Sequence, residues 1–204
     1  MVNYTAKVTV SVIILAAGNA SRMGKPKQLL PFKNATLLEH AISQALNSKI
    51  KEVYCILGAN SQNIKKTVSS SQITFIDNPK WKEGLSTSIV KGINYLETLE
   101  KQLDAVLIML CDQPFVNVNY IDLLVNTFAS NPDSIIASNY GGKHGVPAIF
   151  PKKAFQYLTN LKGDKGAKDV LNNSIFNVIS VTPKSEEVLT DIDTPEDYES
   201  LNKN

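Results

Sequence analysis

An apolar run that ends abruptly in a loop of small residues constrains the fold of this chain more than any other feature. The segment 12–30 reads VIILAAGNASRMGKPKQLL. A buried strand that feeds such a loop is how α/β folds build ligand sites at the carboxyl edge of a sheet. Small residues let backbone N–H groups approach an anion closely, and Arg22, Lys25 and Lys27 supply cations for a polyphosphate.

Two common phosphate-binding loops are excluded by the spacing. Gly18 and Gly24 are one residue too far apart for G-x-x-x-x-G-K-[ST], and Pro26 stands where Ser or Thr is needed. The dinucleotide fingerprint G-x-G-x-x-G fails because Ala20 and Ser21 follow Gly18 and Asn19. A generic glycine turn with solvated basic residues is the simpler alternative, but the loop follows a predicted strand and carries several motif residues together.

Apolar, β-rich runs alternate with segments of helical periodicity along the chain. We expect strands at 8–15, 52–57, 73–76, 105–110, 134–137, 146–150 and 175–181. We expect helices at 35–47, after a Ser61 cap, and at 86–99, 118–128, 152–159, 165–171 and 195–201. This alternation predicts the α/β class, with a doubly wound, mostly parallel, Rossmann-like sheet. Strand 146–150 follows a turn at 139–142, and we expect it in a small β-rich insertion.

The composition restricts the number of domains, the kinds of partner and the cellular compartment that can be expected. The chain has 204 residues, of which 43% are hydrophobic, and this suits one domain over 1–204. A net charge of +2 argues against a nucleic acid partner. Cys55 and Cys111 lie in apolar runs, so we expect buried thiols in a cytoplasmic protein, with a disulfide between adjacent strands as the alternative. Without a signal-like leader or an apolar run of about 18 residues, no membrane association is expected.

Asp112 ends the apolar run VLIMLCDQPF. A buried strand would deliver this carboxylate to the sheet edge, where Mg²⁺ prefers one or two carboxylates together with phosphate oxygens and water. We therefore predict Asp112 as a metal ligand. Capping of the next helix, suggested by the turn at Pro114, is the alternative.

A second acidic group lies at Asp191-Ile192-Asp193-Thr194-Pro195-Glu196-Asp197. Alternation places Asp191 and Asp193 on one face of a strand end, where like charges repel unless a cation or donors lie between them. One of them could complete a metal site with Asp112, and we favour Asp193. The same segment predicts a helix start, with Thr194 and Asp197 as a variant capping box.

These motifs resemble those of the nucleotidyltransferases that act on NTPs. The string L-A-A-G-x-x-x-R-M-G-x-x-K, with D-Q-P and D-I-D-T-P-E-D in the same order, is most similar to the MobA/MocA group, which attaches a nucleotide to the molybdenum cofactor. The resemblance implies that Lys27 stabilises transition-state charge, that Arg22 holds the β- and γ-phosphates, and that Mg²⁺ is required. The implied nucleotide-binding residues are Leu15, Ala16, Ala17, Gly18, Arg22, Gly24, Lys27, Gly84, Ser86 and Ser88.

The helix start Gly84-Leu85-Ser86-Thr87-Ser88 is similar to the family's G-M-x-x-S segment. Backbone N–H groups and hydroxyls there could hold an anion or a base edge, whereas a plain Ser cap is the alternative.

The acceptor side departs from the family pattern. Lys143-His144-Gly145-Val146-Pro147 carries Val146 where the family often has histidine, and His144 lies two residues earlier. Gly163-Asp164-Lys165-Gly166-Ala167-Lys168 resembles G-D-x-G-A-R, with Lys168 keeping a cation but losing bidentate phosphate geometry. The resemblance implies acceptor contacts for His144, Pro147, Gly163 and Asp164, although a turn before a capped helix explains the second segment equally well.

Together these features predict an Mg²⁺-dependent nucleotidyltransferase whose NTP-binding half covers about 8–115 and whose acceptor-side and metal-completing half covers about 116–204. Because the loop has Ala17 in L-A-A-G, the resemblance favours CTP over GTP and a molybdopterin acceptor, with a molybdoenzyme receiving the product. The alternatives are a nucleotidylyltransferase acting on a sugar phosphate or methylerythritol phosphate, and a non-catalytic module that binds a nucleotide or cofactor.

Overall fold

The computed structural model describes residues 8–19, 23–50, 52–68, 72–99 and 102–201. The strands are β1 (Val10–Ala16), β2 (Pro31–Phe32), β3 (Ala35–Thr36), β4 (Glu52–Leu57), β5 (Ile73–Asp77), β6 (Ala105–Leu110), β7 (Ile135–Tyr140), β8 (Lys143–Pro151) and β9 (Val178–Val181). The α-helices are α1 (Leu37–Asn47), α2 (Ser61–Thr67), α3 (Leu85–Thr98), α4 (Val118–Ser130), α5 (Phe155–Thr159), α6 (Lys168–Leu171) and α7 (Pro195–Leu201). Short 3-10 turns are η2 (Lys27–Leu29), η3 (Trp81–Glu83), η4 (Lys152–Ala154) and η5 (Glu186–Leu189).

The central sheet confirms the predicted doubly wound, mostly parallel arrangement. Its strand order is β5-β4-β1-β6-β8-β7-β9, and β4 and β6 pair in parallel on either side of β1. Strand β8 runs antiparallel to both of its neighbours, β6 and β7. The β-rich part expected around 146–150 is thus the β7–β8 hairpin, which is continuous with the central sheet. A separate small antiparallel sheet is formed by β2 and β3.

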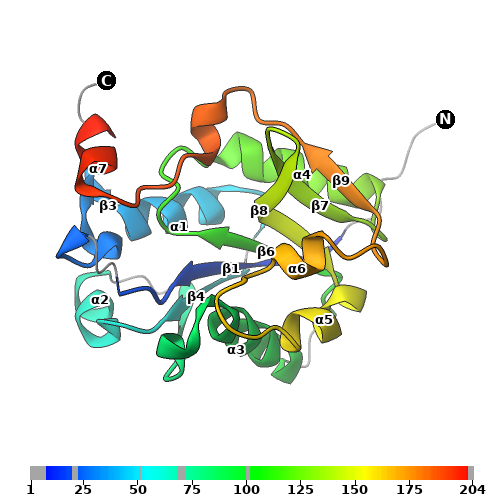
Figure 1. Ribbon diagram of the computed structural model, residues 1–204, viewed down its shortest axis with the longest axis horizontal. Helices are drawn as coiled ribbons and strands as arrows, with labels where there is room; N and C mark the ends of the chain where they lie inside the picture. The colour runs from blue at the N-terminus through cyan, green and yellow to red at the C-terminus, as the bar shows by residue number, and fades with distance from the viewer. Residues whose placement is uncertain (1–7, 20–22, 51, 69–71, 100–101, 202–204) are drawn as a thin grey trace.

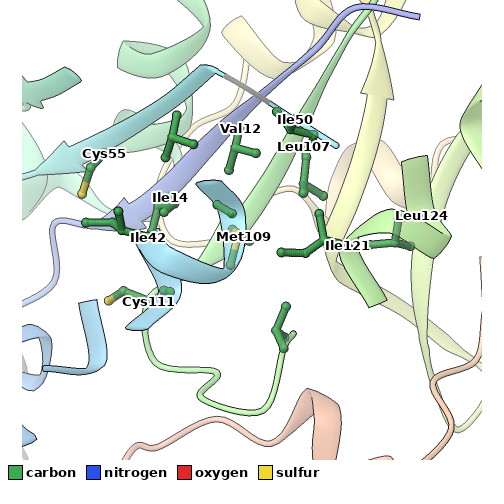
Figure 2. Packing of buried hydrophobic residues seen from close by; sticks show 14 of the residues in the cluster. Val12, Ile14, Ile42, Ile50, Cys55, Leu107, Met109, Cys111, Ile121 and Leu124 are labelled. Atoms are coloured by element: carbon green, nitrogen blue, oxygen red, sulfur yellow. The ribbon is translucent and has the colours of Figure 1, made fainter. Parts of the chain in front are cut away.

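Helices cover both faces of the sheet because its strands are apolar on both sides (Figure 1). Along β1, Val12 and Ile14 face one core cluster, whereas Ile13 and Leu15 face the other. Figure 2 shows the first cluster, in which α1 and α4 place residues such as Ile42 against β1 and β6. Helices α3, α5 and α6 supply the second cluster.

Several predicted boundaries shift for local reasons. Helix α1 begins at Leu37 because Thr36 caps it in a box with Glu39, while Ala35 pairs in β3. The prediction that Ser61 caps α2 is wrong: Asn60 is the N-cap in a left-handed conformation, and the Ser61 hydroxyl donates to Asp77 instead.

The late strand is shorter and the hairpin strands are longer than the sequence predicts. The expected strand 175–181 begins at Val178, and Ile175 is left exposed. The expected strands 134–137 and 146–150 become β7 and β8, which meet at a tight turn at Gly141-Gly142 instead of a four-residue turn.

Both cysteines are buried and free, so the expectation of reduced thiols holds for the structure. They lie in the same apolar cluster as Val12 and Met109 (Figure 2). No helix within the described ranges is long and apolar enough to cross a bilayer.

Candidate active site

A cleft of about 410 Å³ opens beside the carboxyl end of the β1 strand. Ligands of open α/β sheets bind at this edge. Of the predicted nucleotide-binding residues, the following line the cleft: Leu15, Ala16, Ala17, Gly18, Lys27, Gly84 and Ser88. Gly24 and Ser86 do not line it. Arg22 lies outside the described residues.

Gln28 holds the loop after β1 in place, and sequence reasoning missed it. Its Nε2 donates hydrogen bonds to the carbonyl oxygens of Ala16 at 2.8 Å and Gly18 at 2.9 Å. The residue is only 2% exposed, although both Gln28 and its neighbour Lys27 line the cleft. A glutamine beside two leucines, Leu29 and Leu30, was the only sequence signal for this buried position. Gln28 therefore fixes the backbone against which a ligand would lie.

Replacing Gln28 by alanine leaves two carbonyl oxygens without their donor, so we expect the free energy of unfolding to fall by about 1–3 kcal/mol. We also expect weaker nucleotide binding, because the loop loses its support. Urea unfolding and nucleotide titration measure the two effects. The exposed Gln62 offers a matched control, and its change to alanine should alter stability by no more than about 0.5 kcal/mol. Equal effects of the two substitutions would contradict this role of Gln28.

Lys27 lies between two carboxylates that are distant in sequence. Its Nζ is 2.7 Å from Oδ2 of Asp112 and 2.7 Å from Oδ1 of Asp193. The side chains of Lys27 and Asp112 are 17% and 16% exposed, whereas that of Asp193 is 55% exposed. Burial alone would lower the pKa of Lys27, but the two carboxylate charges and hydrogen bonds outweigh it, so the pKa lies above its usual value. The ammonium group is therefore a permanent positive charge at the cleft.

The backbone of the acidic segment 191–197 is joined directly to the end of β6. The amide N–H of Ile192 donates to the carbonyl oxygen of Asp112 at 2.9 Å, and the Ile192 side chain is buried. This contact directs Asp193 toward Lys27. The expected strand end is absent, since residues 191–193 form no strand, but Ile192 is buried between two exposed aspartates as the alternation predicts. The capping box is also present, since Thr194 N–H donates to Asp197 and Asp197 N–H donates to the Thr194 hydroxyl.

Asp191 lies in the same acidic group but makes no ion pair with Lys27. Although the residue as a whole keeps contact with solvent, its carboxyl group is crowded by protein. Loss of water raises the pKa of Asp191 to about 6, and the charge of Asp112 adds to the rise, while a hydrogen bond with Gln113 opposes it.

The donor set fits a divalent cation that is completed by a phosphate ligand. The Oδ1 atom of Asp112 is buried and accepts no hydrogen bond, so it keeps free lone pairs beside the cleft. Across the described part of the chain, no three His, Cys, Asp or Glu side chains are assembled into a closed metal site. Mg²⁺ is commonly held by one or two carboxylates, with substrate phosphate and water as its other ligands. Asp112 and Asp193 meet that requirement.

The start of α3 is joined to the predicted acceptor loop. The amide of Ser86 donates to the carbonyl oxygen of Gly163 at 3.1 Å, and that of Leu85 donates to Oδ1 of Asp164 at 3.3 Å. Gly84 has φ +115°, and a Cβ there would lie 2.5 Å from the backbone of Gly163. These two amides of α3 therefore bind the protein itself, and Asp164 lines the cleft beside them.

His144 and Pro147 lie on β8 and do not line this cleft. The Pro147 carbonyl oxygen accepts a hydrogen bond from the hydroxyl of Ser138 at 2.6 Å. A second link, which sequence reasoning missed, joins β8 to the loop after β6: Gln113 donates to the Tyr140 hydroxyl at 2.8 Å, and Tyr140 donates to the carbonyl oxygen of residue 146. The structure thus brings most of the described phosphate-side candidates to the cleft, but of the four acceptor-side candidates only Asp164 lines it.

Residues 12–178 match the family described as the MobA-like NTP transferase domain. The chain belongs to this family. The resemblance to the MobA-like family is thereby confirmed, and with it an enzyme of the nucleotidyltransferase class.

Three relatives of this MobA-like chain have nearly the same sequence identity to it but carry names that imply different activities. The purine catabolism protein PucB of Bacillus subtilis is 27% identical, with 94% of this chain and 95% of PucB covered. Nicotine blue oxidoreductase of Paenarthrobacter nicotinovorans is 26% identical over 92% of this chain and 93% of its own length. Molybdenum cofactor cytidylyltransferase of Escherichia coli is 26% identical over 93% of both chains. Overall identity therefore does not select one substrate.

The fold of the MobA-like chain is also that of solved structures. The Mycobacterium sp. strain JC1 homologue of the Mycobacterium tuberculosis protein Rv0371c has a TM-score of 0.81 and 26% identity, and the match covers 95% of this chain and 96% of that one.

Proposed function

We propose that this protein transfers CMP from CTP to the terminal phosphate of molybdopterin-type cofactor, with release of pyrophosphate and with Mg²⁺ as the metal. The observation that carries the proposal is the placement of Lys27 between Asp112 and Asp193 beside the small-residue loop after β1. Lys27 and Asp112 line the cleft and Asp193 contacts Lys27, so a fixed cation and two carboxylates lie together, as transfer of an α-phosphoryl group requires.

In this reaction an oxygen of the acceptor phosphate attacks the α-phosphorus, and the bond from that phosphorus to the β-phosphate oxygen breaks. Negative charge develops on the non-bridging oxygens and on the leaving pyrophosphate. Lys27 stabilises this charge, and the backbone of residues 16–18, held by Gln28, positions the triphosphate. Asp112 and Asp193 would hold Mg²⁺, which when bound would supply Lewis-acid stabilisation of the phosphate oxygens.

The choice of CTP rests on the L-A-A-G form of the loop and on the relative named as a cytidylyltransferase. Ala17 lines the cleft, and its carbonyl oxygen already accepts a hydrogen bond from the amide of Ala59. A small side chain here leaves room for a base close to the backbone. The molybdopterin acceptor, and a molybdoenzyme that receives the product, follow from the same resemblance.

A nucleotidylyltransferase that acts on a sugar phosphate or methylerythritol phosphate is the second candidate. The acceptor side favours it in one respect, because His144 and Pro147 do not line the cleft as a molybdopterin site of the family pattern would require. A non-catalytic module is disfavoured by the intact group of Lys27, Asp112 and Asp193.

Pyrophosphate release in the presence of Mg²⁺ tests the proposal. Each of the four NTPs is paired with molybdopterin-type cofactor, with sugar phosphates and with methylerythritol phosphate. Release with CTP and the pterin alone is the expected result. Release with another acceptor only would assign the same chemistry to a different substrate, and tight NTP binding without release in any pair would refute an enzyme with these substrates.

A further inference from the structure

The single tryptophan of the chain, Trp81, lines the same cleft as the proposed catalytic residues. It begins η3, the short turn that leads into α3, and it is partly buried. Neither the proposed transfer of the phosphoryl group nor the metal site uses it. The Lys82 ammonium lies 5.5 Å from the centre of the indole ring, and because Lys82 is exposed and flexible it can move aside for a ligand.

Gly58 fixes the position of Trp81. A Cβ on Gly58 would lie 2.5 Å from Cβ of Trp81 and 2.7 Å from the carbonyl oxygen of Ala17. Only a residue without a side chain lets the Trp81 side chain and the Ala17 carbonyl oxygen approach residue 58 this closely. The Ala17 carbonyl oxygen is held there by the amide of Ala59, so the start of the nucleotide loop and Trp81 form one packed unit.

The topology separates Trp81 from the catalytic group. Gly58 follows β4, whereas Asp112 follows β6, and these two strands flank β1 on opposite sides. Adjacent strands lie about 5 Å apart, so β4 and β6 are roughly 10 Å apart, a span that a nucleoside can bridge. With the α-phosphate at Lys27, the base of the nucleotide would extend toward Trp81.

The cleft that Trp81 lines also contains a hydroxyl group that can donate a hydrogen bond. Ser88 lines the cleft, and its hydroxyl oxygen accepts a hydrogen bond from Nδ2 of Asn78 at 3.0 Å. The Ser88 hydroxyl hydrogen is then available to donate to a ligand. An aromatic wall with a nearby donor is how proteins bind a planar base that has acceptors on its edge.

We propose that the indole of Trp81 is the stacking surface for the nucleobase of the NTP, and that Ser88 donates to the edge of that base. This inference rests on the proposed function, because it needs an NTP with its α-phosphate at Lys27. It assigns to Trp81 a role in substrate affinity and none in the chemical step.

Since the chain has one tryptophan, its fluorescence reports on this site directly. We expect a non-hydrolysable CTP analogue with Mg²⁺ to change the tryptophan emission. Inorganic tripolyphosphate, which has no base, should bind by calorimetry but leave the emission nearly unchanged. Calorimetric binding of the CTP analogue with no change in emission would overturn the role of Trp81 and leave the proposed function standing. Failure of both ligands to bind would overturn both.

Steady-state kinetics give a second, independent test. Replacing Trp81 by alanine should raise the KM for the NTP roughly 5- to 100-fold, with the loss falling on KM and not on kcat. Trp81→Phe keeps a ring and should restore most of the affinity, which also separates stacking from a folding defect. A Trp81→Phe variant as weak as a folded Trp81→Ala variant, or a loss confined to kcat, would overturn the proposal.

Discussion

Replacing Lys27 by alanine is expected to lower kcat by roughly 1,000-fold or more, with a much smaller change in nucleotide affinity. The reason is positional. The Nζ atom lies 2.7 Å from a carboxylate oxygen on each side, so it is fixed before substrate arrives and needs no rearrangement when charge develops. Pyrophosphate release under saturating NTP and acceptor measures the loss, and circular dichroism checks that the fold is kept.

Lys25 provides the matched control for this experiment. It lies two residues earlier on the same loop and is exposed. Its change to alanine removes the same charge from the same region, yet it should lower kcat by less than about 10-fold, because an exposed ammonium is well solvated and screened. Equal losses in the two variants would mean that general charge near the loop matters, and not the placement of Lys27.

Replacing Asp112 by asparagine is expected to lower kcat by roughly 100-fold or more and to raise the Mg²⁺ concentration needed for half-maximal rate. Asparagine keeps the shape of the side chain, and Lys27 retains its contact with Asp193, so the fold should persist. The buried Oδ1 of Asp112, which accepts no hydrogen bond, is the atom whose charge a divalent cation would use. Rate against Mg²⁺ concentration is the measurement.

Asp191 and Asp193 provide the comparison for the Asp112 variant. Asp193 contacts Lys27 and should behave like Asp112 when changed to asparagine, whereas Asp191 makes no such contact and should show a smaller shift in Mg²⁺ requirement. A larger shift for Asp191→Asn than for Asp193→Asn would exchange their roles. Unchanged Mg²⁺ dependence in Asp112→Asn would refute this metal site altogether.

Most of the sheet could be predicted because its strands are buried on both sides and therefore read as continuous apolar runs. The run 52–57 agrees with β4 at both ends, and 105–110 agrees with β6. The predicted strand 146–150 is shorter than β8 because the first residues of β8, Lys143 to Gly145, carry no apolar side chain and are exposed or half-buried. Pairing with β7 sets their conformation, and no local pattern reports that.

The residues of the candidate site also differ in whether a local sequence pattern could predict them. Lys27, Asp112 and Asp193 could be named from motifs, since each follows a strong local signal. Gln28 could not, because its importance lies in two hydrogen bonds to the carbonyl oxygens of a neighbouring loop. Trp81 was missed for a similar reason: a lone aromatic residue reads as core until Gly58 is seen to bring it to the cleft.

The contact between Lys27 and Asp193 joins residues 166 positions apart, and the amide of Ile192 ties the second of them to the end of β6. Because this segment follows β9, the last described strand of the central sheet, the sheet can form before Asp193 reaches Lys27. Local unfolding of the C-terminal segment would then remove one carboxylate from the site and leave the sheet intact.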